Sequence, residues 1–219
     1  MIAGLIFTVV AATFLQVLIF KYVTPPFTVN MIYERAIAAR KKMQFKPRAY
    51  DWKNLDQISV YLQQAALASE DQRFMCHHGF DFTEIKIALN DIIAQKGVRG
   101  ASTISMQTAR SLFLPSSRTL ARKLAEAWYT VLIELVWDKK RILEMYLNTV
   151  DWGKANVGAQ AAARAYFSCN AKNLTAEQAA LLTAILPSPH KWSAVNPGPH
   201  VRQRQARILK QMKNMPVIK

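Results

Sequence analysis

The chain begins with an uninterrupted apolar stretch. Residues 1–20 carry no charged side chain, and Lys21 follows them directly. At ~1.5 Å per residue, this stretch forms a helix of about 30 Å, the thickness of a bilayer's hydrocarbon core. Pro25 and Pro26 stop it, because proline does not fit a helix interior. The alternative is a cleaved signal peptide, but the positive n-region is missing and residues 21–26 make a poor cleavage site. We therefore predict a transmembrane anchor over residues 1–23.

Beyond the anchor, apolar residues recur with helical spacing almost throughout. Residues 24–55 are predicted to form a linker with a basic amphipathic helix at 31–43, a pattern suited to anionic headgroups or to an ordinary solvated surface. Residues 56–219 are predicted to form one helical domain. Its helices are expected over residues 56–69, 81–97, 102–112, 119–137, 139–148, 156–167, 176–186 and 199–213. Since no run of alternating strand residues appears, the predicted fold class is mainly α.

Local signals place the helix ends and faces. Asp81 and Ser102 are expected N-caps, and Thr175 with Gln178 forms a capping box. Gly97 is expected to close the helix after Asp81. Two apolar stripes are expected to face the core: Ile85, Ala88, Leu89, Ile92 and Ile93 in one helix, and Leu120, Leu124, Trp128, Val131 and Leu135 in another.

The charge is strongly positive. Lys plus Arg number 29 and Asp plus Glu 14, which gives a net charge of +15. Such a chain is expected to meet anions: nucleic acid, anionic lipid or phosphorylated substrates. The anchor makes nucleic acid the weakest of the three. By the positive-inside rule alone, Lys21 and Arg35 after the span would place the domain in the cytoplasm. Cys76 and Cys169 are expected to be unpaired and suggest no metal site.

One segment, residues 70–81, is dense in chemistry. It carries Glu70, Asp71, Phe74 and His77 directly after an apolar run. A carboxylate placed where an apolar face meets water can become a general acid or base. The plain alternative is a charged helix end followed by a polar loop.

A second group of charges lies in residues 110–126. Arg118, Arg122 and Glu126 stand four residues apart on one helix face, with Lys123 beside them. An exposed ladder of ion pairs would explain them. Together with Arg110 and the Gly100 turn before a helix, they also suit a phosphate or pyrophosphate cradle. The spacing of a P-loop is absent, so a nucleotide hydrolase is not supported.

In their order along the chain, these motifs resemble those of the peptidoglycan glycosyltransferases, membrane-anchored enzymes that polymerise lipid II. The matching segments are Glu-Asp-x-x-Phe-x-x-His-x-Gly-x-Asp at 70–81, Gly-Ala-Ser-Thr-Ile-Ser at 100–105 with Gln107, Arg-Lys-x-x-Glu at 122–126, and Ile-Leu-Glu-x-Tyr-Leu-Asn at 142–148. The resemblance covers roughly residues 25–213 and is to the monofunctional branch of the family. It implies a lysozyme-like helical domain.

The resemblance also implies a role for each matching residue. Glu70 is expected to be the general base, and Glu126 a second essential carboxylate that orients cations or holds a divalent metal, Mg²⁺ or Mn²⁺. No cofactor is expected to be obligatory. Pyrophosphate is expected to meet Arg110, Arg118, Arg122 and Lys123, while Ser102, Thr103 and Gln107 line the sugar-phosphate site. Asp71, Phe74 and His77 are expected to shape the loop around Glu70, and for Phe74 and His77 a purely structural role is an equal alternative.

Two positions depart from the family pattern. Met106 stands where the family usually has a glutamine, and a thioether cannot replace the donors of an amide. That position is either dispensable or alters substrate binding. Arg110 replaces a lysine, which keeps the charge but changes the geometry.

The resemblance further implies partners and a location. The expected partners are lipid II, the growing glycan strand, the bilayer, and other cell-wall synthases or division proteins. The expected location is the bacterial inner membrane, single-pass, with the domain in the periplasm. Two other functions stay open: a membrane-anchored glycan hydrolase, which the cation cluster disfavours, and an inactive cell-wall scaffold, which the two glutamates disfavour.

Overall fold

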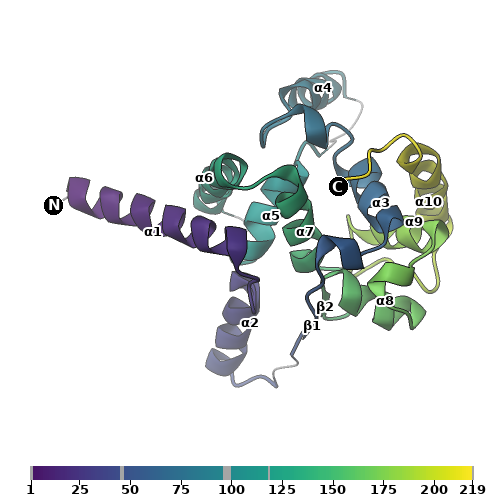
Figure 1. Cartoon of the computed structure of the whole chain (residues 1–219), viewed down its shortest axis with the longest axis horizontal. Coiled ribbons are helices and arrows are strands. Elements are labelled where there is room, and N and C mark those ends of the chain that lie inside the picture. Colours follow the sequence, from purple (N-terminus) through teal and green to yellow (C-terminus); the bar gives the residue numbers. More distant parts are fainter. Residues whose placement is uncertain (1, 45–46, 96–99, 118, 219) are drawn as a thin grey trace.

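The computed structural model describes residues 2–44, 47–95, 100–117 and 119–218, and most of them are helical. This confirms the mainly α fold. The first helix, α1 (Ile2–Tyr22), projects from the rest of the molecule as a long rod (Figure 1). Its segment Ala3–Tyr22 has a mean hydropathy of 2.3 and is long and apolar enough to cross a membrane. As expected from Pro25 and Pro26, the helix ends just before them.

Two polar side chains in the second half of α1 contact α6 (Leu120–Val136). Trp128 Nε1 donates a hydrogen bond to Thr13 Oγ1 at 3.1 Å, and the Tyr129 hydroxyl donates one to Gln16 Oε1 at 2.8 Å. A polar side chain in an apolar segment is stabilised by such a partner. The half of α1 nearest the domain therefore contacts α6.

After the anchor, the chain turns sharply into α2 (Val29–Arg40), which points away from α1 in Figure 1. Thr28 caps α2, because its hydroxyl accepts the N–H of Met31 at 3.3 Å. The sequence pattern predicts this helix two or three residues later. It contains no fully buried side chain.

Two packed groups of helices form the body of the domain. In the first, α5 (Ile104–Phe113) packs against α6 and against α7 (Lys139–Thr149). In the second, α3 (Val60–Glu70) packs against α9 (Ala176–Ile185) and α10 (Pro199–Met212). The apolar face of α3 lies in the core, since Leu62, Ala65 and Ala66 are fully buried. The capping box of α9 is confirmed as well.

The remaining elements are short or peripheral. Strand β1 (Ala49–Tyr50) pairs in parallel with β2 (Asn156–Val157), and α8 (Ala159–Phe167) follows. The prediction of a helix from residue 156 was therefore wrong at its start. Gly158, with φ +86°, separates the strand from the helix. In the described part of the chain, short 3₁₀ turns occupy Leu55–Gln57, Phe74–Cys76 and Ala171–Asn173.

The core stripes predicted for α4 (Phe82–Ile93) and α6 were wrong. On α4 only Ala88 is buried, and Ile93 is 80% exposed. On α6 the whole predicted stripe is exposed, whereas Leu132 and Ile133 on the other face are buried. Periodicity identifies an apolar face but not the medium that it meets. Gly97, the expected end of α4, lies outside the described residues.

Candidate active site

Glu70 is the last residue of α3, and its carboxylate is held by three donors. Ser69 Oγ donates to Oε1 at 2.7 Å, Gln107 Nε2 to Oε2 at 3.2 Å, and Arg204 Nη2 to Oε1 at 3.3 Å. Because α3 buries its apolar face against α9 and α10, its last turn is fixed at the domain surface. The Glu70 side chain is 14% exposed, so its carboxylate is ordered but still reachable.

A cavity of about 520 Å³ opens beside Glu70. Its lining comes from the end of α3, the loop after it, the start of α5 and α10. Of the predicted site residues, it contains Glu70, Asp71, Ser102, Thr103, Gln107 and Arg110. The structure thus brings together residues that are up to 40 positions apart in sequence.

The N-terminus of α5 is anchored to the loop after Glu70. Asp71 Oδ2 accepts the N–H of Ile104 at 2.9 Å, and both Asp71 oxygens contact His77 Nε2 at 3.0 and 3.1 Å. Thr103 is the N-cap of α5 and also donates to the carbonyl of Gly79 at 2.5 Å. The prediction of Ser102 as the cap was wrong by one residue. Ser102 instead lines the cavity.

Gln107 links Glu70 to the domain core. Tyr146 on α7 is fully buried, and burial together with the nearby Glu70 charge raises the pKa of Tyr146 well above its ordinary value. The protonated hydroxyl donates to Gln107 Oε1 at 3.4 Å. The amide is thereby turned so that its Nε2 faces Glu70. Tyr146 is a site residue that the sequence motifs contained but did not mark.

Phe74 and His77 pack against each other within the loop that follows Glu70. Phe74 is buried, Lys139 Nζ lies 4.4 Å from the centre of its ring, and His77 meets it edge-on. Neither residue lines the first cavity. Both therefore contact the loop away from the first cavity, and the site-shaping role and the structural alternative stay predictions.

Glu126 lies fully buried in the first half of α6. Arg122 Nη1 donates to one carboxylate oxygen at 2.6 Å, and Lys123 Nζ contacts the other. Thr119 caps the helix and so fixes the turn that carries both cations. An exposed ladder of ion pairs is excluded here, because a surface carboxylate would not be enclosed. Arg118 lies outside the described residues.

A second cavity, of about 230 Å³, adjoins the first. Gln107, Arg110 and Leu186 line both, so the two cavities adjoin, and together they are called the cleft below. Arg122 lines the second cavity, and its Nε is buried without a hydrogen-bond partner among the described residues. Arg110 is exposed in the shared wall, and no ion pair or hydrogen bond engages its guanidinium within the described part of the chain. The cleft thus offers a carboxylate at one end and arginines available to an anion at the other.

The residues do not suit a metal at Glu126, since both of its oxygens already contact cations. A second group, formed by Asp71, His77 and Asp81, has donor atoms within 4.8 Å of one another. Its carboxylates are also engaged: Asp81 caps α4 and accepts from Arg73 Nε at 2.9 Å. Both groups are held by protein donors.

Met106 lies in the core and lines neither cavity. The absence of an amide there therefore leaves the walls of the cleft unchanged. Arg204, by contrast, is a cleft residue that sequence reasoning missed. It comes from α10, 134 residues after Glu70, and no local motif links the two.

Comparison with known proteins agrees with this geometry. The model of the family described as transglycosylase matches residues 37–213. The chain belongs to the transglycosylase family. Every residue that lines the first cavity lies within the stretch that matches this transglycosylase family, whereas Thr28 and Asn30 of the second cavity precede it.

Several curated relatives carry the name biosynthetic peptidoglycan transglycosylase. The one from Pseudomonas aeruginosa is 46% identical over 202 residues, which cover 92% of this transglycosylase-family chain and 87% of that protein. The one from Stutzerimonas stutzeri is 44% identical over 214 residues, covering 98% and 88%. The one from Aeromonas hydrophila is 44% identical over 208 residues, covering 95% and 87%.

Proposed function

We propose that this chain is a membrane-anchored peptidoglycan glycosyltransferase that polymerises lipid II into β-1,4-linked glycan strands. The single observation that carries the proposal is the pair of adjoining cavities, with Glu70 lining one and Arg122, which is paired with the buried Glu126, lining the other. The names of the relatives support peptidoglycan as the product.

In the proposed reaction, Glu70 accepts the proton of the acceptor sugar's 4-hydroxyl as that oxygen attacks the donor's anomeric carbon. The new C–O bond forms as the bond from the anomeric carbon to phosphate breaks, and the anomeric centre is inverted. The electron pair leaves with the polyprenyl pyrophosphate. The three donors around Glu70 fix its direction, so it meets the hydroxyl without rearranging.

The leaving pyrophosphate carries the charge that develops in the transition state. Arg110 and Arg122 line the second cavity, and their N–H groups can stabilise that charge. The proposed role of Glu126 is to orient Arg122 and Lys123 through its two carboxylate oxygens, and not to bind a metal. Ser102 and Thr103 border the first cavity, beside the acceptor.

We assign α1 to the inner membrane and the domain to its periplasmic side, where lipid II is presented. Helix α6 contacts α1, and its exposed apolar side chains suit contact with lipid at the surface of that membrane. Lipid-linked substrates would then enter the cleft from the bilayer.

The test is to incubate the full-length protein in liposomes with labelled lipid II and to resolve the products by size. Polymer that a muramidase cuts back to disaccharide units supports the proposal. Unchanged lipid II together with cleavage of preformed glycan would establish the hydrolase instead. If neither substrate reacts, the scaffold is favoured.

A further inference from the structure

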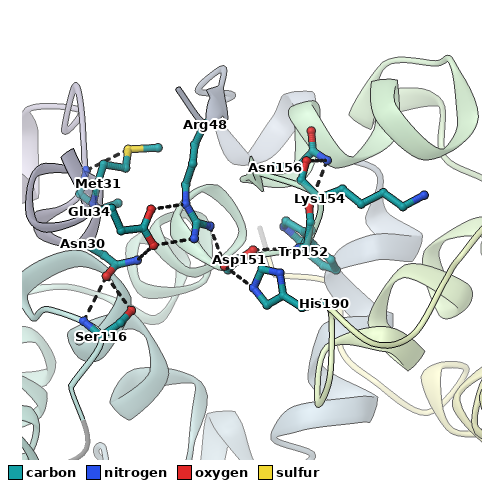
Figure 2. A network of polar contacts seen from close by, with 12 residues as sticks. Asn30, Met31, Glu34, Arg48, Ser116, Asp151, Trp152, Lys154, Asn156 and His190 are labelled. Carbon is teal, nitrogen blue, oxygen red and sulfur yellow. Dashed lines mark hydrogen bonds and ion pairs between the residues drawn. The ribbon is translucent and has the colours of Figure 1, made fainter. Parts of the chain in front are cut away.

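The helix that follows the anchor is tied to the cleft by polar contacts on one face (Figure 2). Asn30 and Glu34 stand one turn apart on α2, and Asn30 Nδ2 donates to Glu34 Oε1 at 3.1 Å. Asn30 Oδ1 accepts from the N–H of Ser116 at 3.1 Å and from its Oγ at 2.6 Å. Ser116 belongs to the connection between α5 and α6, so α2 holds the segment that leads to Arg122.

Arg48 makes the second connection. Its Nε and Nη2 donate to the two oxygens of Glu34, both at 2.6 Å, and its Nη1 donates to Asp151 Oδ2 at 2.6 Å (Figure 2). Asp151, just after α7, also accepts the N–H of Gly153 at 2.8 Å and contacts His190 Nε2 at 3.1 Å. The Arg48 guanidinium therefore joins α2 to the segment of the domain that follows α7.

These contacts border the second cavity. Asn30, Arg48, Ser116 and Asp151 all line it, as do Arg110 and Arg122. Since α2 has no fully buried side chain, apolar packing alone holds it weakly. The side chain of Arg48 is only 13% exposed, and without it Glu34 and Asp151 would face each other with no cation between them.

We propose that Arg48 is a positioning residue that holds α2 as the outer wall of the donor subsite. This inference rests on the proposed function, in which the second cavity receives the pyrophosphate of the lipid-linked donor. The contacts of Arg48 with Glu34 and Asp151 are called the α2 clamp. Because only a short linker, residues 23–28, separates α1 from α2, the α2 clamp sets the distance between the membrane surface and that cavity. The donor's lipid and its pyrophosphate can then reach their sites together. Arg48 itself does not touch the reacting atoms.

The kinetic test compares Arg48→Gln with Arg164→Gln in liposomes. Arg164 on α8 pairs with Asp51 through Nη1 at 2.9 Å and lines neither cavity of the cleft, so the control loses an arginine ion pair elsewhere. For Arg48→Gln we expect KM for lipid II to rise about tenfold while kcat stays within about twofold. Arg48→Lys should be intermediate, because an ammonium cannot make all three fork contacts. Arg164→Gln should leave both constants unchanged.

The second readout does not depend on activity. In a background with Cys76→Ser and Cys169→Ser, spin labels at Arg40→Cys on α2 and Lys213→Cys after α10 report the distance from α2 to the domain. Arg48→Gln should broaden that distance distribution, and Arg164→Gln should not. An unchanged distribution, or an unchanged KM in an active protein, would overturn the inference. A wild type that makes no polymer would instead contradict the proposed function, and the distance measurement would still decide the clamp.

Discussion

Glu70 and Glu126, the two glutamates of the candidate site, have opposite surroundings. Glu70 is reached by neutral and charged donors and stays accessible, whereas Glu126 is enclosed with two cations on its oxygens. An enclosed carboxylate cannot take a proton from a sugar hydroxyl in the cleft. Its chemistry is to fix Arg122 and Lys123, so removing its charge should disturb the anion site.

We expect Glu126→Gln to lower the rate of polymerisation by about 10²-fold or more, because the cations lose the charge that orients them. Glu134→Gln is the matched control: Glu134 lies on the same helix and pairs at 2.8 Å with Lys139, which lines neither cavity, whereas Arg122 lines the second. The control should lose stability but keep its rate. Equal losses of rate in both variants would show that any buried ion pair of α6 has the same effect, and would contradict the assignment.

Gly79 allows the loop after Glu70 to approach α6. Its φ is +92°, and an added Cβ would lie 2.8 Å from Thr130 Cγ2. Gly79→Ala should therefore lower the free energy of unfolding by about 1–3 kcal/mol. Gly100→Ala, at a glycine with open space around it, should change stability much less. Urea unfolding of both variants measures the difference, and equal stabilities would contradict the argument.

Asp81 should make the domain acid-sensitive. Burial raises the pKa of Asp81, but hydrogen bonds from the N–H groups of Glu84 and Thr83 and the charge of Arg73 outweigh it, and the pKa is lowered below its ordinary value. A lowered pKa adds stability that is fully present above the ordinary value and is lost as pH falls through the folded-state value. Unfolding free energy should thus decline below about pH 4, and less steeply in Asp81→Asn, as urea titrations at several pH values can measure.

At the scale of elements, sequence patterns located most helices but not their surroundings. Capping signals found α4 and α9, and Pro25 and Pro26 marked the end of α1, because these effects are local. The apolar stripes of α4 and α6 were predicted to face the core, but both are largely exposed. Helix α6 buries its other face and also contacts the anchor. The code for an apolar face is the same whether protein or lipid covers it.

Sequence patterns also identify only part of the candidate site, because they do not show which remote segments come together. The family resemblance of the ordered motifs predicts that Glu70, Gln107, Arg122 and Glu126 belong to one site. In the structure Glu70, Gln107 and Arg122 line the cleft, and Glu126 is paired with Arg122. Arg48 and Arg204 cannot be found that way, because each reaches its partner from a helix or linker that is remote in sequence. Such contacts depend on how helices pack, which composition and spacing do not encode.

The exposed stripe of α6 should contact lipid. A nitroxide at Leu124→Cys, in the background without Cys76 and Cys169, should be relaxed more by oxygen than by a water-soluble nickel chelate in liposomes. A nitroxide at Lys213→Cys, on the exposed end of α10, should show the reverse. If Leu124→Cys is relaxed mainly by the nickel chelate, the stripe faces water and the proposed membrane contact is wrong.

At the scale of the whole molecule, the anchor, α6, the α2 clamp and the cleft form one connected arrangement. Helix α1 contacts α6, which carries Glu126, and continues into α2, which borders the second cavity. A substrate that keeps its lipid in the bilayer can thus be met by cations close to the surface. This arrangement suits a polymerase of lipid-linked sugars better than an enzyme that cuts a glycan far from the membrane.

The most direct test of the account is the rate of lipid II polymerisation by Glu70→Gln in liposomes, with products resolved by size. The control is Glu177→Gln, at an exposed glutamate in the first turn of α9 that lines neither cavity. The account predicts long polymer from the wild type and from Glu177→Gln, and a rate at least about 10²-fold lower from Glu70→Gln, whose fold should be intact. Polymer formed at the wild-type rate by Glu70→Gln would contradict the central claim that Glu70 is the base.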